Sequence, residues 1–248
     1  YQVTTLDGRY ETTPVLAELA TDGVEFVNTR VIVPETAKAW WASLTATYPD
    51  LQEDSVESVL MDEPFESLAT ILKRDGYRSA FFEMSRGAFL GAPGFFANQG
   101  YDWAWFRENL EDESAHIGAL NGDDFRMIEP MFEWVDASDE PYLLTMITSV
   151  AHDPYELPEW YEHEPGRTRF DKHLQTVTFT DAFVGAVIEE LERRGTLDDT
   201  LLCVVGDHGE VFRPESRRGR WVAFEELLRV PWLMRWPGHL EALSLIHI

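Results

Sequence analysis

The stretch LLCVVGDHGE, residues 201–210, decides the fold class of this chain. Five apolar residues run without a break, as in a strand that is buried on both faces of a parallel sheet. Asp207 and His208 follow directly, and functional side chains of open α/β sheets gather beyond the carboxyl ends of the strands. The stretch therefore predicts an α/β protein with chemistry at the end of this strand.

The alternation of apolar strands and amphipathic helices extends outward from this stretch. Helices are indicated by caps, by apolar residues at helical spacing and by glycine stops. The expected helices are 14–22, 37–45, 65–74, 125–135 and 168–194, and the expected strands are 24–33, 78–82, 142–150, 201–205 and 230–234. We expect a mostly parallel central sheet with helices on both faces, in one catalytic domain over residues 1–240.

Both ends of the chain differ from those of a complete domain of this kind. It begins with loop-like sequence, and it stops soon after the turn Trp236-Pro237-Gly238. We therefore expect the first strand and the C-terminal part to be missing. The tail 241–248 has no periodic partner, and we expect it to be non-native.

Composition excludes several classes of protein. The 248 residues are 44% hydrophobic, which is enough for one sizeable core, and they include one cysteine, so an internal disulfide is impossible. Neither a membrane segment nor a signal segment is visible in this stretch of chain, and the cytoplasm and the cell surface both stay open as locations. The net charge of −25 disfavours nucleic-acid partners. With only three lysines, it favours a halophilic protein, the alternative being an ordinary acidic enzyme.

A second predicted strand, 142–150, ends in the same way as the first, because His152-Asp153-Pro154-Tyr155 follows it closely. If the two strands are parallel neighbours, His152 faces the same crevice as Asp207 and His208. The alternative is an ordinary loop histidine whose hydrogen bonds are satisfied locally.

Thr36 is the third candidate, because it lies between a strand that ends at Val33 and the helix 37–45. The free N–H groups and the positive end of the helix dipole favour both an alkoxide and an incoming anion at this position. The alternative is a simple helix cap, for which threonine is a preferred residue. Asp207 and His208 supply the oxygen and nitrogen ligands that suit zinc or manganese, or else they only cap a strand end.

Several further motifs occur in a fixed order between residues 12 and 238. They are TPVLAELA with GVEF (13–20, 23–26), ASLT with YP (42–45, 48–49), SLATILK with GYRSAFF (67–73, 76–82), HDPY (152–155), GDHGE (206–210), and LRVP with RWPG (228–231, 235–238). Together they resemble the sulfatase/alkaline-phosphatase superfamily. The resemblance implies the alkaline-phosphatase-like α/β fold and an enzyme that acts on phosphate or sulfate esters.

The resemblance also implies a nucleophile thirteen residues before Pro49, which is Thr36. The stretch 36–40 has none of the cysteine, proline and arginine of the sulfatase formylglycine motif, and threonine cannot mature to formylglycine. Threonine nucleophiles are typical of the phosphoglycerol-transferase, lipoteichoic-acid-synthase-like and nucleotide-pyrophosphatase branches. We therefore expect a hydrolase or transferase that acts on a phosphodiester or phosphoglycerol group, or on a sulfate ester, of a small molecule, lipid or glycan.

The same resemblance implies a divalent metal ion, manganese, zinc or calcium, held by Asp207, His208 and Thr36 together with an acid expected before Tyr1. We expect His152 to hydrogen-bond the substrate oxyanion or the leaving group, with Lys38 as a weaker candidate for a contact with the phosphate.

Two positions differ from the sulfatase pattern. Met84 stands where sulfatases carry a lysine, and the expected late metal-site histidine falls near Gly219 or Arg220. Two alternatives therefore stay open, a true sulfuric-ester hydrolase and a non-catalytic member that binds an anionic ligand.

Overall fold

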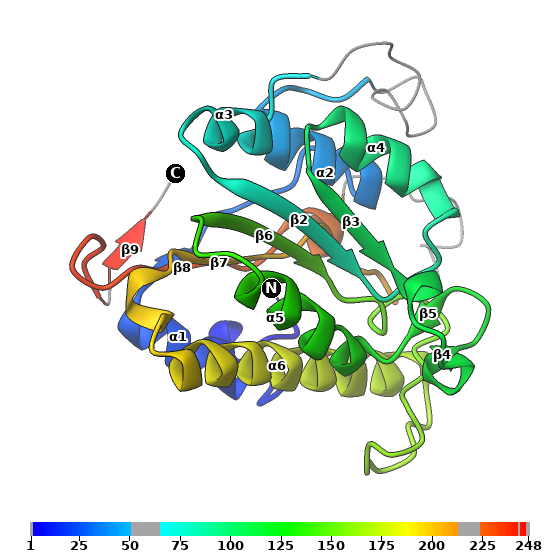
Figure 1. Ribbon diagram of the computed structural model, residues 1–248. Helices are drawn as coiled ribbons and strands as arrows, with labels where there is room; N and C mark the ends of the chain where they lie inside the picture. Colours follow the sequence, from blue (N-terminus) through cyan, green and yellow to red (C-terminus); the bar gives the residue numbers. More distant parts are fainter. Residues whose placement is uncertain (1, 51–64, 213–223, 243, 247–248) are drawn as a thin grey trace. The chain divides into compact units, whose positions relative to one another are not determined.

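The computed structural model describes residues 2–50, 65–212, 224–242 and 244–246. The chain divides into two compact units, which are coloured along the sequence in Figure 1. Unit 1 comprises Tyr1–Ala39 and His163–Ile248, and unit 2 comprises Trp40–Glu162. Within the described ranges, no helix combines the length and the apolar character that crossing a membrane requires.

Unit 1 contains a four-stranded sheet in the order β7, β8, β1, β9. The central strand β8 runs antiparallel to both β7 and β1, whereas β9 runs parallel to β1. One face is covered by the helices α1 and α6, through a core of Leu16, Leu19 and Leu233. The bounds are β1 Val24–Phe26, β7 Leu202–Val205, β8 Trp232–Arg235, β9 Ser244–Ile246, α1 Pro14–Asp22, α6 Arg169–Arg194 and α7 Glu225–Leu228.

The long helix α6 has a clear start and a clear stop. Thr168 and Asp171 form a capping box at its beginning, and Gly195 ends it in the left-handed conformation. In its middle, the buried carboxylate of Asp181 accepts hydrogen bonds from the backbone N–H groups of Val15 (2.9 Å) and Leu16 (3.0 Å). These bonds satisfy free donors in the first turn of α1 and tie the two helices together.

Unit 2 contains a parallel three-stranded sheet in the order β3, β2, β6, and a small hairpin of β4 and β5. Figure 1 shows α3 and α4 on one side of this sheet and α5 on the other. The first side has an aromatic core in which Phe81 and Phe96 stack with ring centres 3.5 Å apart. The bounds are β2 Arg78–Glu83, β3 Trp103–Phe106, β4 His116–Ile117, β5 Asn121–Gly122, β6 Tyr142–Ile147, α3 Leu68–Arg74, α4 Ala92–Asn98 and α5 Ile128–Asp136.

The boundary between the units falls within helix α2, Thr36–Thr45, since Ala39 closes one part of unit 1 and Trp40 opens unit 2. Short 3₁₀ turns complete the fold. They are η1 Thr5–Asp7, η2 Phe89–Gly91, η3 Arg107–Asn109, η4 Glu113–Ala115, η5 Asp124–Met127 and η6 Leu197–Asp199.

The predicted α/β class is confirmed, and the parallel sheet of unit 2 has helices on both faces. Three strand predictions differ from the structure. The strand expected over 24–33 stops at Phe26, where Thr29 turns the chain by donating to the Phe26 carbonyl, and the strand expected over 142–150 stops at Ile147. β7 pairs antiparallel with β8, and its Val205 is 47% exposed, because only Leu202 and Val204 pack in the core below α1 and α6.

An apolar run alone does not distinguish a strand buried on both faces from one that is covered on a single face. Residues 244–246, within the tail expected to be non-native, form β9 beside β1. One catalytic domain over 1–240 and a non-native tail remain predictions.

Candidate active site

Three side chains of unit 1 converge at the end of β7 and the start of α2. The hydroxyl of Thr36 donates a hydrogen bond to Asp207 Oδ2 over 2.8 Å, and its Oγ1 lies 3.4 Å from His208 Nε2. The third side of the triangle, from His208 Nε2 to Asp207 Oδ2, is 3.6 Å. The Asp207 side chain is 38% exposed and that of His208 is 24% exposed, so the site is open to solvent.

Local hydrogen bonds orient both the carboxylate and the imidazole. Asp207 Oδ1 accepts the backbone N–H of His208 over 2.8 Å, which turns Oδ2 toward Thr36. His208 Nδ1 lies 2.8 Å from the carbonyl oxygen of Gly209, and a carbonyl can only accept, so Nδ1 carries the proton. The neutral ring therefore presents the lone pair of Nε2 to the site.

One backbone segment, residues 227–231, holds both arms of the site. On one side, the backbone N–H groups of Gly206 and Gly209 donate to the carbonyls of Pro231 and Leu227 over 3.0 and 2.8 Å. On the other side, the segment that leads to Thr36 is held by Val31 N–H, which donates to Leu228 O over 2.9 Å. Backbone bonds that need no particular side chain thus bring residues 36 and 207 together.

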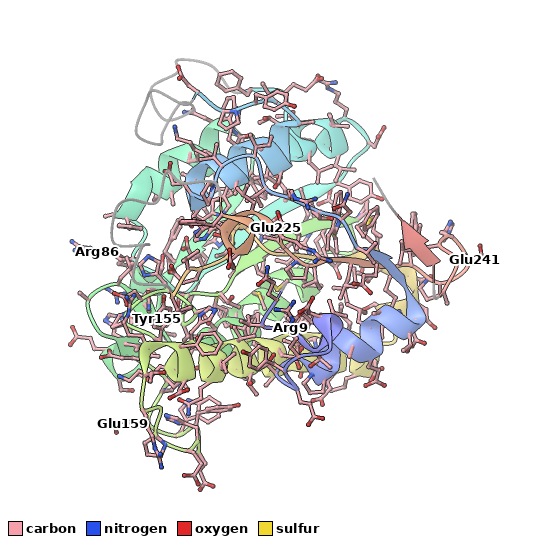
Figure 2. All side chains as sticks on the ribbon, turned by 180° about the vertical axis from the view of Figure 1, so that it is seen from behind. Arg9, Arg86, Tyr155, Glu159, Glu225 and Glu241 are labelled. Carbon is pink, nitrogen blue, oxygen red and sulfur yellow. The ribbon has the colours of Figure 1, made fainter. Side chains whose placement is uncertain are left out.

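An ion pair reinforces the same segment. Arg30, four residues after the end of β1, contacts Glu225 in the first turn of α7 over 2.7 Å, and Figure 2 labels Glu225 at this helix. Both side chains are more than two-fifths exposed, so the pair adds little free energy of folding. At the same place an isolated antiparallel bridge joins the backbones of Arg30 and Arg229.

Gly209 allows a close backbone approach in the loop that carries the site. A Cβ atom at this position would lie 1.9 Å from the carbonyl oxygen of Glu226, a distance that no side chain can adopt. A glycine is therefore required beside Asp207 and His208, because this loop packs closely against α7.

The three donor atoms fit one face of a coordination sphere. The ligands of a tetrahedral zinc ion with bonds of ~2.1 Å lie roughly 3.4 Å apart, and the donor separations here are 2.8, 3.4 and 3.6 Å. The bond from His208 Nδ1 to a backbone carbonyl is a typical outer-shell contact of a metal-ligating histidine. Among the described residues, no group of three or more His, Cys, Asp or Glu side chains could hold a metal ion. The candidate site accordingly depends on the threonine hydroxyl as its third donor.

A buried histidine lies behind this loop. His173 of α6 packs against the ring of Phe212, with ring centres 5.0 Å apart. Burial lowers the pKa of His173 to about 4, with a smaller opposing effect from Glu210. His173 is therefore neutral at physiological pH and serves as packing behind the loop.

The remaining predicted residues have different surroundings. Lys38 lies in the first turn of α2 and is fully buried. His152 lies in unit 2, in the loop after β6, and β6 and β7 pair with different strands in different sheets. The condition from which a shared crevice was inferred is therefore not met, and the substrate contacts of His152 and Lys38 remain predictions. Met84 is a fully buried core residue, and Gly219 and Arg220 lie outside the described residues.

A buried carboxylate next to the His152 loop, Asp124, was not predicted from the sequence. It is fully buried and hydrogen-bonded to Ser149 and Val150. Asp124 is one of 45 acidic residues, and nothing in the sequence marks it as buried. Composition and spacing therefore could not identify it. The only local signal is the pair Asn121-Gly122, which forms β5 and directly precedes two aspartates.

Comparison with known proteins places these features in a family. The family pattern described as Sulfatase matches residues 2–247. Among curated relatives, an ulvan-active sulfatase of Formosa agariphila is 22% identical over 91% of this chain and 52% of its own length. Lipoteichoic acid synthase 1 of Bacillus subtilis is 21% identical over 92% of this chain and 38% of its own length. The chain thus spans about half or less of these relatives.

Solved structures show the same fold. The lipoteichoic acid synthase of Listeria monocytogenes superposes with a TM-score of 0.80 at 21% identity, over 97% of this chain and 62% of that one. A protein of the alkaline phosphatase superfamily from Vibrio parahaemolyticus also gives 0.80, at 22% identity, over 99% of this chain and 59% of that one. The predicted alkaline-phosphatase-like fold is therefore confirmed.

Proposed function

The chain belongs to the sulfatase family, and we propose that it is the catalytic part of a metal-dependent hydrolase or transferase that uses Thr36 as its nucleophile. One observation carries the proposal, namely the convergence of the Thr36 hydroxyl with Asp207 Oδ2 and His208 Nε2 within 3.6 Å. A nucleophile in contact with a proton acceptor is the arrangement that covalent catalysis needs.

Asp207 prepares the hydroxyl for attack. Its Oδ2 accepts the Thr36 proton over 2.8 Å and takes up this proton as Thr36 Oγ1 forms a bond to phosphorus. The bond between phosphorus and the leaving oxygen breaks in the same step, this oxygen takes a proton from solvent to leave as the alcohol, and the group is transferred to the threonine as an ester. Water or a second alcohol then attacks phosphorus and releases Thr36, which decides between hydrolysis and transfer.

A divalent cation is implied by the family, and Thr36, Asp207 and His208 are the residues that would hold it. When bound, such an ion supplies a lower pKa for a hydroxyl and neutralises negative charge that develops on a phosphoryl group. Manganese, zinc and calcium all stay candidates, although the single imidazole favours manganese or zinc over calcium.

We further propose that His152 hydrogen-bonds the substrate or its leaving group through Nε2. Its Nδ1 lies 2.8 Å from the carbonyl oxygen of Asp153 and therefore carries a proton, so Nε2 of the neutral ring accepts a hydrogen bond from a hydroxyl of the substrate or of the leaving group. Lys38 is the proposed second contact for the substrate anion, where its charge in the first turn of α2 adds to the helix dipole.

A phosphate ester is our first choice of substrate, because a threonine cannot become the aldehyde that sulfatases use. The named relatives include both chemistries, an ulvan-active sulfatase and lipoteichoic acid synthases. Paired nitrophenyl substrates separate the two. We expect faster turnover of bis-nitrophenyl phosphate than of nitrophenyl sulfate, and the reverse ranking would support a true sulfuric-ester hydrolase.

The decisive variant is Thr36→Ala, assayed in the presence of manganese or zinc. Loss of the nucleophile should lower kcat by at least ~1,000-fold, about 4 kcal/mol of barrier. Thr36→Ser should retain a large part of the activity, because it keeps the hydroxyl. Thr45→Ala is the matched control in the same helix, since that hydroxyl donates only to the Trp41 carbonyl (2.7 Å), and it should leave kcat unchanged.

Full turnover by Thr36→Ala would refute the proposed nucleophile. Metal analysis addresses the remaining alternative, a non-catalytic member of the family. A protein that binds anions but retains neither manganese, zinc nor calcium, and that turns over neither ester, would support that alternative.

A further inference from the structure

We propose that Asp124 is a positioning residue, which fixes the loop that carries His152 through the side chain and backbone of Ser149. This inference rests on the proposed function, because it assigns His152 a contact with the substrate. All of the residues involved lie in unit 2.

Asp124 directly binds two adjacent residues near the start of the loop, Ser149 and Val150. Its Oδ1 accepts the backbone N–H of Ser149 over 2.8 Å and lies 3.0 Å from Ser149 Oγ. Its Oδ2 accepts the backbone N–H of Val150 over 3.3 Å. The aspartate is 0% exposed, so water cannot replace these bonds.

Ser149 links this carboxylate to the surrounding strands. Its Oγ accepts the backbone N–H of Gly122 over 3.2 Å and lies 3.1 and 3.3 Å from the carbonyl oxygens of Gly122 and Met84. A Cβ atom at Gly122 would lie 2.9 Å from the carbonyl oxygen of Met84, so these backbones are in close contact. The hydroxyl of Ser149 therefore joins the chain after β6 to β5 and to the residue that follows β2.

The loop continues from this point to His152 through short backbone bonds. His152 N–H donates to Ser149 O over 3.1 Å, and Tyr155 N–H donates to His152 O over 3.0 Å. Asn121 Nδ2 donates to the same His152 carbonyl over 3.4 Å. The position of the His152 backbone thus follows from the position of Ser149.

The end of the turn is fixed as well. Tyr155 has a backbone φ of +60°, which is unfavourable for residues other than glycine, and its side chain is buried, with only 3% of the residue exposed. Figure 2 labels Tyr155 near the body of the protein and Glu159 at the outer end of the same connection. The rigid part of the loop is therefore the short stretch from Ser149 to Tyr155.

A buried carboxylate is a costly way to stabilise a fold, because burial raises the free energy of its charged form. This cost is visible in the pKa of Asp124, which burial raises to about 7 while the bonds from Ser149 and Val150 lower it. The protein thus keeps a carboxylate at a place that disfavours its charge, because an apolar residue there would leave the two adjacent N–H groups of Ser149 and Val150 without an acceptor.

The test compares Asp124→Asn with Asp181→Asn at pH 8, where Asp124 is ionised. Both replacements keep the shape of a buried carboxylate that accepts two backbone N–H groups, but Asp181 lies in unit 1 and binds α1. Asp124→Asn should speed amide hydrogen exchange of residues 149–152 by at least tenfold. It should also lower kcat at least tenfold for the nitrophenyl ester that the protein turns over, with KM changed less than threefold.

Asp181→Asn should change neither the exchange of residues 149–152 nor kcat. Ser149→Ala, which removes only the hydroxyl, should give intermediate exchange and intermediate kcat. Unchanged exchange in Asp124→Asn would overturn the inference, and so would faster exchange with unchanged kcat. A fully active His152→Ala would instead refute the proposed role of His152, while the exchange data would still decide whether Asp124 holds the loop.

Discussion

Titration of Asp124 should make the stability of the protein depend on pH in a defined direction. Burial raises its pKa to about 7, and the adjacent Asp123 contributes a smaller effect of the same sign. In the unfolded chain, an aspartate has a pKa of about 3.9. The folded protein therefore holds a proton more tightly than the unfolded chain does. The resulting stability is fully present below about pH 4 and is lost as the pH rises through about 7.

The size of the effect follows from the difference between the two pKa values. About three pKa units correspond to about 4 kcal/mol over the whole range, of which about 2.5 kcal/mol is lost between pH 5 and pH 8. The replacement Asp124→Asn removes this titration, because the amide does not ionise. The free energy of unfolding of the wild type should thus fall about 2.5 kcal/mol more than that of the variant across this interval.

Urea unfolding at pH 5, 6, 7 and 8, followed by tryptophan fluorescence at constant high salt, measures this difference. The nine tryptophans of the chain provide the signal. The titration of all other carboxylates is common to both proteins and cancels in the comparison. Parallel curves for the wild type and Asp124→Asn would refute the reasoning, because they would mean that Asp124 has an ordinary pKa in the folded state.

Three further predictions concern other parts of the molecule. Asp181→Ala should lower the free energy of unfolding by about 2 to 3 kcal/mol in chemical denaturation, because it leaves two N–H groups of α1 without their acceptor. Gly209→Ala should abolish detectable metal binding in calorimetry while the far-ultraviolet circular dichroism stays native, since its Cβ would overlap the Glu226 carbonyl beside the site. The melting midpoint should rise with KCl concentration, because screening weakens the repulsion within a chain of net charge −25, and a flat or falling midpoint would contradict a halophilic adaptation.

The helices were predictable because their signals are local. The start of α1 at Pro14, the start of α6 after Thr168 and the stop at Gly195 all depend on residues within one turn of the helix end. Strand partners and the layout of the sheets were not predictable in the same way. The run that forms β7 has the same apolar character whichever strand it pairs with, and its partner β8 lies almost thirty residues further along the chain.

Elements without a strong period were missed for a related reason. β3 and α4 are short and rich in aromatic residues, and their faces become distinct only when Phe95 and Phe96 pack against Phe81. Aromatic residues fit both helices and strands at an internal surface. The spacing within seven residues does not decide between these alternatives.

The candidate site shows the same division between local and distant information. Asp207 and His208 were recognisable because they follow the end of β7 directly, Thr36 was recognisable because it begins a helix, and the order of the motifs relates all three to one family. The groups that hold the functional residues in place give no such local signal in the sequence. Leu227–Pro231 holds both arms through backbone groups, which leave no trace in the choice of side chain. Asp124 acts through a carboxylate that looks like any other in an acidic chain. Chemistry at strand ends is therefore readable from a single sequence, whereas the groups that hold the chemistry in place become visible only when burial and hydrogen bonds are known.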